Sequence, residues 1–445
     1  MFFTRFHKQT GPFSSAALAL VLAATGTVGV IALEQPAQAQ RKKDKSSDEA
    51  KPDYSKEFIA AYQPANEIMQ SAAPDYQAVA AMLPNILAAT KNGDEKNVAG
   101  TLQFNVGLKL EDEAMQLRGL EMMRDSGKLD PARAGSVDIT MYQMYRGQNN
   151  VEAARAALER AMAANYSFEA TMNDGSQRTV GPEQMTPMIA ELYFDQERYA
   201  DGVNYLAEQI EARKAAGQSV PEAWIRSGLS NAYNNNVPSQ VTKFVGWLAN
   251  DYPSDTVWGD AVIVTLNANQ YQNAEILDLL RLARRTGNYN DARVISEYVE
   301  VLDPRRYPGE VVAVIDHGTS LGLLKGGDSY ITETRKDAAG RVAADKAELP
   351  SIAKGARSPN ADLKTLVVAG DTFLSYDQPA EAEEFYTRAL GMSGVETPMV
   401  LTRLGIAQYD QGKYAEAAET FKKVDGARRD VANLWAIYAT QKASR

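Results

Sequence analysis

The sequence predicts an all-α protein, an α-solenoid in which antiparallel helix pairs stack on one another. Apolar residues recur mostly at helical spacing from Phe58 onward, which is the pattern of amphipathic helices. Small and aromatic residues also return at fixed intervals, as they do in repeat proteins. Short polar breaks separate the helical segments, and the clearest are Asn92–Asp94, Asp125–Gly127 and Asp410–Gly412.

The first 39 residues have the pattern of a secretory signal peptide. Arg5 and Lys8 precede an apolar run over residues 16–33. The small-residue site Ala37–Ala39 follows, so we predict cleavage after Ala39. An uncleaved N-terminal anchor is the alternative, because a run of this length is at the low end of what spans a bilayer.

The charge and the cysteine content of the chain exclude several classes of partner and site. Of 47 basic and 57 acidic residues, cleavage removes Arg5, Lys8 and Glu34, which leaves 45 and 56 and a formal charge of -11. An acidic chain without a long basic run argues against a nucleic-acid partner. The absence of cysteine excludes disulfides, thiolate metal sites and cysteine nucleophiles. An exported chain without disulfides favours the periplasm, with secretion as the alternative.

The mature chain divides by pattern into four segments after a leader. Residues 40–56 are rich in charged and small polar residues and predict a flexible leader. The four predicted segments are 57–135 (divergent repeats or a cap), 136–304 (helix pairs), 305–362 (an irregular helical insertion or a degenerate repeat) and 363–445 (helix pairs with a capping helix). No segment after the signal is apolar enough to predict a membrane span.

Two β-branched stretches interrupt this helical pattern. They cover residues 262–265 and 311–315. Because each stretch is short and lies within a longer helical pattern, we interpret both as buried turns of helices rather than as strands.

The clearest helix pair lies near the C-terminus. Gly405 and Ala417 are small enough to let two helices approach closely. Gly412 marks the turn between them, and Tyr414 covers the junction. Phe421 is predicted to fill the gap toward the following helix.

Similar spacing occurs in two further places. One copy begins at Leu280 and the other at Gly370, and weaker copies begin at 142, 190 and 230. The packing residues predicted for the two stronger copies are Leu280, Gly287, Tyr289, Ala292 and the stop Pro304 in the first, and Gly370, Ala382, Tyr386 and Ala389 in the second.

These intervals resemble those of the tetratricopeptide-repeat family, whose unit is a pair of antiparallel helices with a small residue, a turn glycine, an aromatic residue and alanine at such spacings. Only the step from 370 to 405 approaches the family's period of about 34 residues. The resemblance implies a right-handed solenoid with a concave groove that binds a peptide or protein partner. The Lys and Asn set with which the family holds a chaperone's C-terminal carboxylate is absent here.

The sequence nominates no catalytic residue, metal ligand or cofactor. His317 is the one histidine outside the signal, and its neighbours Asp316 and Ser320 do not make a triad with it on a helix. Neither a phosphate-binding loop nor a complete calcium loop occurs. We therefore predict a non-catalytic scaffold or adaptor. The alternatives are an enzyme of the cell wall or of exported polysaccharides on a helical frame, and a self-associating structural repeat protein.

The best local hypothesis for partner binding is one basic helix face. Arg281, Arg284 and Arg285 lie together on the first helix of the copy that begins at Leu280. Their guanidinium groups are suited to an acidic segment of a partner, through charge-assisted hydrogen bonds. The alternative is that they pair with acidic residues of their own chain.

Overall fold

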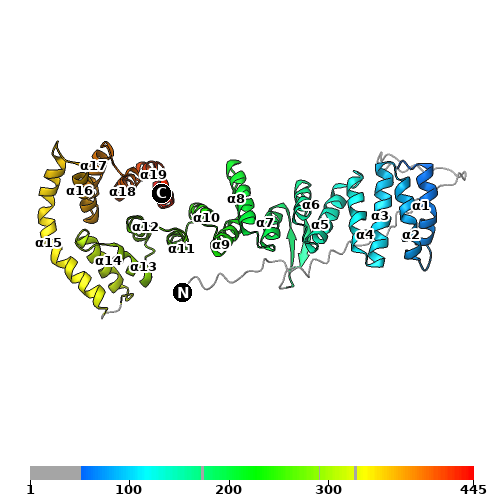
Figure 1. Ribbon diagram of the computed structural model, residues 1–445, viewed down its shortest axis with the longest axis horizontal. Coiled ribbons are helices and arrows are strands. Elements are labelled where there is room, and N and C mark those ends of the chain that lie inside the picture. Colours follow the sequence, from blue (N-terminus) through cyan, green and yellow to red (C-terminus); the bar gives the residue numbers. More distant parts are fainter. Residues whose placement is uncertain (1–51, 172–174, 290, 325–327, 445) are drawn as a thin grey trace. The chain divides into compact units, whose positions relative to one another are not determined.

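The computed structural model describes residues 52–171, 175–289, 291–324 and 328–444 (Figure 1). This part of the chain forms 20 α-helices and one short β-hairpin, which confirms the all-α class and the stacking of successive helices. The predicted signal peptide, residues 1–39, and most of the predicted leader lie outside the described residues. No helix in the described ranges is both long and apolar enough to cross a membrane.

The described residues fall into two compact units, which meet between Gly202 and Val203 in the sequence. The boundary falls within a helix, Tyr199–Ala215, and so coincides with none of the predicted segment limits. The predicted limits lie where the repeat spacing in the sequence becomes clearer or weaker. The units are instead defined by the contacts that residues make within each of them.

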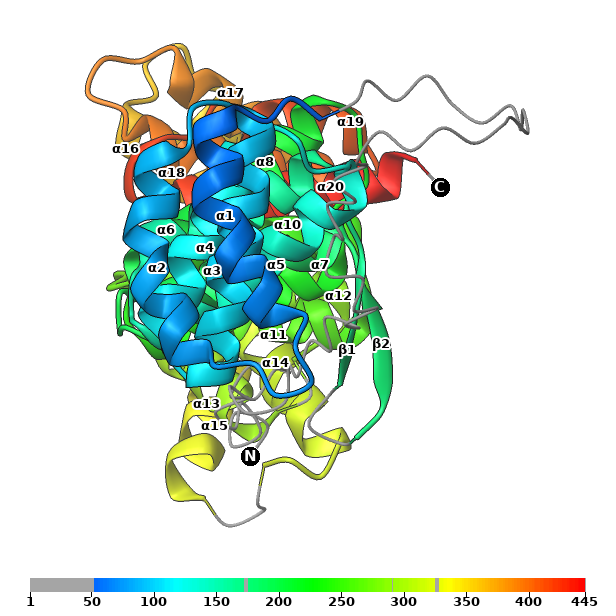
Figure 2. The ribbon, with the colours of Figure 1, turned by 90° about the vertical axis from the view of Figure 1, so that its right-hand side faces the viewer.

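In the first unit each helix contacts the next one from α1 to α7. Figure 2 looks onto α1 and α2, which lie side by side. The elements are α1 (Lys56–Met69), α2 (Tyr76–Ala89), α3 (Gly93–Leu110), α4 (Glu113–Asp125), α5 (Pro131–Gly147), α6 (Val151–Ala163), β1 (Phe168–Thr171), β2 (Gln177–Val180), α7 (Pro182–Phe194) and the start of α8 (Tyr199–Ala215).

The second unit contains the rest of α8 and all later helices, and its last helix, α20, packs against α10, α11 and α12. The C-terminal end of the unit therefore returns to its first half (Figure 1). The elements are α9 (Glu222–Asn234), α10 (Pro238–Asp251), α11 (Asp255–Ala268), α12 (Asn273–Thr286), α13 (Ala292–Val301), α14 (Pro308–Ser320), α15 (Ser329–Arg357), α16 (Leu363–Ser375), α17 (Pro379–Leu390), α18 (Thr397–Asp410), α19 (Tyr414–Phe421), the 3-10 turn η2 (Gly426–Arg428) and α20 (Arg429–Ala443).

Short polar side chains begin the helices of the first unit. Each of these side chains accepts a hydrogen bond from a backbone N–H in the first turn, which satisfies a donor that has no partner within the helix. The capping residues of α1 to α6 are Ser55, Asp75, Asn92, Asp112, Asp130 and Asn150. Two of the predicted breaks agree, since Asn92 caps α3 and Gly127, with a φ of 67°, follows the end of α4.

In three helix pairs of the second unit a glycine packs closely against an aromatic ring that lies 16 residues later. A Cβ built on Gly405 would lie 2.6 Å from the ring of Phe421, and one on Gly370 would lie 2.5 Å from the ring of Tyr386. The predicted close approach of both helix pairs is thus confirmed. Phe421 also stacks on Trp435 of α20 at 5.5 Å, as predicted for the residue that faces the next helix.

The same contact occurs in a pair that the sequence identified poorly. Gly228 of α9 faces the ring of Phe244 in α10, where an added Cβ would lie 2.0 Å from the ring. The copy predicted to begin at 230 therefore has its small residue two positions earlier.

Most of the other predicted packing residues lie where they were expected. Leu280, Ala382, Ala389 and Ala417 are fully buried, and Tyr289 is nearly so. Turn glycines Gly287 and Gly412 adopt φ values of 76° and 78°, which favour glycine. The remaining members are Ala292, which begins α13, Pro304, which follows the end of α13, and Tyr414, which begins α19 and contacts the ring of Tyr409.

One β-hairpin was not predicted from the sequence. Strands β1 and β2 form an antiparallel hairpin in which Phe168 pairs with Val180. Four-residue strands are too short to stand out against helical periodicity. The segment 305–362, predicted as an irregular helical insertion or a degenerate repeat, contains α14 and the 29-residue helix α15. The stretches 262–265 and 311–315 lie within α11 and α14, as predicted.

We expect Gly405→Ala to destabilise the second unit by about 1–3 kcal/mol, because the added methyl group overpacks against Phe421. Urea unfolding followed by circular dichroism measures the change. Gly340→Ala in α15 is the matched control, since nothing lies within 4 Å of its added Cβ. That change should stabilise by up to about 1 kcal/mol through helix propensity. Equal effects of the two substitutions would contradict the packing argument.

Candidate functional site

Arg281, the first residue of the predicted binding face, is buried inside the second unit. Its side chain is 1% exposed. The guanidinium donates to Glu310 at 2.7 Å and to Asp278 at 3.2 Å. The prediction that Arg281 binds a partner is therefore wrong, because its guanidinium is buried and is paired with Glu310 of α14 and Asp278 of its own helix, α12.

Arg284 and Arg285 lie at a cavity of 270 Å³ in the same unit, together with Asp377, Pro379 and Asp410. Arg285 holds Asp410 through two hydrogen bonds of 3.1 and 2.6 Å. Arg284 lies 3.7 Å from the carboxylate of Asp377. For this face the structure shows the arrangement that the sequence left as the alternative, pairing with acidic residues of the same chain.

Asp278 is the centre of the charge network that holds Arg281. Its side chain is fully buried, and it accepts hydrogen bonds from Arg281, from Arg403 at 3.4 Å and from Arg428 at 2.5 Å. The indole nitrogen of Trp435 donates to the backbone oxygen of Asp278 at 2.9 Å. One residue of α12 thus connects α18, η2 and α20.

A second buried carboxylate extends the network to α16. Asp371 accepts hydrogen bonds from Arg403 at 2.7 Å and from the hydroxyl of Tyr386 at 2.7 Å. Burial alone raises the pKa of Asp371, but the positive charges of Arg403 and Arg306 outweigh burial and lower it. Three buried arginines, Arg281, Arg403 and Arg428, are thereby balanced by three buried acids, Asp278, Glu310 and Asp371.

Glu310 shows the strength of this pairing. Burial raises its pKa, but the charge of Arg281 and the hydrogen bonds from Arg281 and Tyr298 dominate and lower the pKa to about 2. The carboxylate is therefore charged throughout the neutral range. Because it is already fully engaged with its own chain, it is not available for chemistry.

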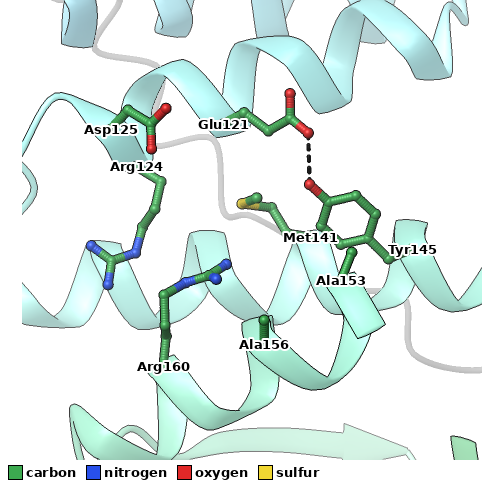
Figure 3. A pocket seen from close by; sticks show the side chains of 8 residues that line it. All are labelled: Glu121, Arg124, Asp125, Met141, Tyr145, Ala153, Ala156 and Arg160. Carbon is green, nitrogen blue, oxygen red and sulfur yellow. Dashed lines mark hydrogen bonds between the residues drawn. The ribbon is translucent and has the colours of Figure 1, made fainter. Parts of the chain in front are cut away.

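A larger cavity, of 550 Å³, lies in the first unit between α4, α5 and α6 (Figure 3). The sequence analysis named none of its residues. Its lining consists of Glu121, Arg124, Asp125, Met141, Tyr145, Ala153, Ala156 and Arg160. The volume lies within the range of small-ligand sites, about 300–1,000 Å³.

Two arginines of this cavity share a single buried carboxylate. Asp138 of α5 is fully buried and accepts from Nε of Arg124 at 3.0 Å and from Nε of Arg160 at 2.7 Å. The arginine side chains are 32% and 35% exposed. In the described part of the chain no hydrogen bond involves Nη1 or Nη2 of Arg124 or Arg160. These terminal nitrogens are therefore available to a ligand, and Asp138 holds both groups in place.

An acidic wall faces the same cavity. Glu121 and Asp125 lie one turn apart on α4, and the hydroxyl of Tyr145 donates to Oε1 of Glu121 at 2.6 Å (Figure 3). Burial, together with this hydrogen bond and the charge of Glu121, raises the pKa of Tyr145. Tyr145 is therefore a neutral donor that fixes Glu121. Within the described residues, neither Oε2 of Glu121 nor the carboxylate of Asp125 forms a hydrogen bond or an ion pair.

The sequence did contain a signal for this site. Asp138 lies between Val137 and Ile139, which are both buried, so it occupies the core face of α5. A buried carboxylate needs charged or hydrogen-bonding partners. What sequence spacing does not reveal is which partners these are, because Arg124 and Arg160 are 14 and 22 residues away on other helices.

His317 packs against an aromatic side chain. Its ring stacks on that of Tyr289 at a centroid distance of 4.1 Å. Among the described residues there is no group of three or more His, Cys, Asp or Glu side chains that is placed to hold a metal ion.

Comparison with known proteins adds no family to this description. No model of a protein family matches the chain, and a search of curated proteins finds no match.

We expect Asp278→Asn to destabilise the second unit by about 3–5 kcal/mol, because it leaves buried arginines without a full complement of acids. The urea midpoint measures the loss. Glu222→Gln is the control, since it breaks an exposed pair with Arg226 on α9. That change should cost at most about 0.5 kcal/mol. A similarly small loss for Asp278→Asn would show that the network does not hold the unit together.

Acid should lower the free energy of unfolding of the second unit. The pKa of Glu310 is about 2 in the folded protein and 4.5 in an unperturbed chain, so the unfolded state binds more protons in acid. Its contribution to stability is therefore complete above about pH 5 and is lost as the pH falls toward about 2. We expect the urea midpoint to fall over this interval. Glu310→Gln should lower the midpoint at neutral pH and make its dependence on pH shallower, and an unchanged slope would contradict this role.

Proposed function

We propose that this chain is a non-catalytic adaptor of the bacterial cell envelope, which binds a peptide or protein partner on its stacked helices. The observation that carries the proposal is the cavity between α4, α5 and α6, where the terminal nitrogens of Arg124 and Arg160 have no hydrogen-bond partner among the described residues. A groove between stacked helices that contains such donors is suited to a polar ligand.

The cavity is organised before any ligand arrives. Nε of Arg124 and Nε of Arg160 are both fixed on Asp138, whose side chain is fully buried. Arginines that are already ordered lose less conformational entropy on binding than mobile surface arginines do. A binding role fits this arrangement, because the bonds to Asp138 use only the Nε atoms and leave the terminal nitrogens of both guanidinium groups at the cavity.

Repeat-family membership and location form part of the same proposal. The contacts of Gly370 and Gly405 with aromatic rings 16 residues later support a tetratricopeptide-like helix pair. The N-terminal pattern with Ala37–Ala39 supports export and cleavage, and the lack of cysteine supports the periplasm. We propose a protein or peptide partner rather than a nucleic acid, since the mature chain is acidic.

One observation favours a second candidate function, an enzyme of the cell wall or of exported polysaccharides. Glu121 and Asp125 are two acids in one cavity, and paired carboxylates perform glycoside hydrolysis. In such enzymes the two carboxyl groups flank the scissile bond. Here both residues project from the same face of α4 one turn apart, so they approach a ligand from one side. Binding therefore fits this geometry better than hydrolysis.

Photo-crosslinking in cells tests the adaptor function. A compact diazirine amino acid at Ala153, which lines the cavity, should give discrete protein or peptide adducts. The same amino acid at Ala132, an exposed residue of α5 that does not line the cavity, is the matched control. Arg124→Gln, which leaves Asp138 paired with Arg160, should weaken the adducts at position 153. Adducts that are the same at both positions, or that are unchanged by this substitution, would contradict the proposal.

A further inference from the structure

The cavity of the first unit carries charges of both signs, with Glu121, Arg124 and Asp125 on α4 and Arg160 on α6. Arg124 and Arg160 contribute terminal nitrogens that form no hydrogen bond among the described residues. Oε2 of Glu121 and the carboxylate of Asp125 likewise have no partner in that part of the chain, whereas Oε1 of Glu121 accepts from Tyr145. A uniformly charged ligand would satisfy one set of groups and be repelled by the other.

We propose that this cavity binds a short zwitterionic peptide, whose carboxylate lies on the Arg124–Arg160 pair and whose ammonium group lies on Glu121 and Asp125. The inference rests on the proposed binding function, because it names the ligand class of the same cavity. It goes beyond that function by requiring both charges in a single ligand.

The arginine pair matches a singly charged anion. The two guanidinium groups carry two positive charges, and the buried carboxylate of Asp138 neutralises one of them. One carboxylate therefore completes the balance, whereas a doubly charged phosphate exceeds it. A carboxylate is also planar, so each of its oxygens can accept from one guanidinium in a charge-assisted hydrogen bond.

The acidic wall requires a cation in the same ligand. Glu121 is fixed by Tyr145, which leaves Oε2 of Glu121 directed away from that bond, and Asp125 is one turn further along α4. A ligand with only a carboxylate would meet two uncompensated negative charges. An ammonium group neutralises one of these two charges and can donate a hydrogen bond to each acid.

The size of the cavity limits the length of the ligand. A volume of 550 Å³ leaves room for a ligand of only a few residues. An extended chain spans at most about 3.6 Å per residue, so a peptide of two residues is short enough for such a volume. Met141, Ala153 and Ala156 provide apolar lining that suits small side chains.

Isothermal titration calorimetry with the mature chain tests the ligand class. The probes are the dipeptide alanyl-alanine with free ends, its N-acetyl form, which lacks the cation, and its C-terminal amide, which lacks the anion. The free dipeptide should bind at least about tenfold more tightly than either blocked form, since each charged contact contributes on the order of 1.4 kcal/mol or more. Equal affinity for all three forms, or tighter binding of inorganic phosphate, would overturn the proposal.

Single substitutions assign each charge to its wall. Asp125→Asn should reduce the preference for the free dipeptide over its acetylated form, because only Glu121 then holds the ammonium group, and leave the preference over the amide. Arg160→Gln should do the reverse. Arg133→Gln, at an exposed position of α5 outside the cavity, is the control and should leave both preferences unchanged. Because Asp125 is exposed and has no partner among the described residues, its substitution leaves folding intact. If a variant lowers the affinity for all three dipeptide forms equally, the residue that was replaced does not distinguish a charged end of the ligand from a blocked one.

The outcome separates this inference from the adaptor function. If no dipeptide form binds at millimolar concentration while the adducts at Ala153 persist, the zwitterionic ligand is excluded and the adaptor stands. If the dipeptide binds with the expected pattern but no macromolecule is crosslinked, the cavity is a receptor for a small peptide and the adaptor role fails.

Discussion

The second unit depends on one buried carboxylate that three arginines share. Asp278 accepts from Arg281, Arg403 and Arg428, which come from α12, α18 and η2. Taking such charges out of water is unfavourable, and the arrangement is stable only because every member has a partner of opposite sign. The network therefore selects one packing of α12 against the C-terminal helices, since any other packing would leave a buried charge unmatched.

The first unit also contains a buried carboxylate that is shared by arginines, but there the arginines line a cavity. Asp138 is also fully buried and also gathers arginines, but Arg124 and Arg160 give it only their Nε atoms. Around Asp278 the balance of three bases and three acids is completed within the chain. Around Asp138 it is left incomplete at the surface of a cavity. A charge cluster that closes on itself stabilises a fold, whereas one that stays open toward solvent provides a place for a ligand.

Sequence reasoning succeeded where the relevant contacts are local. Gly405 and Phe421 belong to one helix pair, so a fixed spacing predicted their contact. It failed for Arg281 because the burial of that residue depends on partners such as Arg403 and Trp435, which meet Asp278 from 125 and 157 residues away. No periodicity encodes such a return of the chain. The arginine cavity was missed for the same reason, since its residues come from three helices and match no spaced motif.

The packing of α20 against α10, α11 and α12 limits how the second unit can change in evolution. An open stack of hairpins tolerates duplication or loss of a hairpin, since each contacts only its neighbours. Here, deleting or inserting a hairpin between α12 and α20 would move Arg403, Arg428 and Trp435 out of reach of Asp278. The number of hairpins in this unit is therefore fixed, and length variation among related chains should fall in the first unit or in loops.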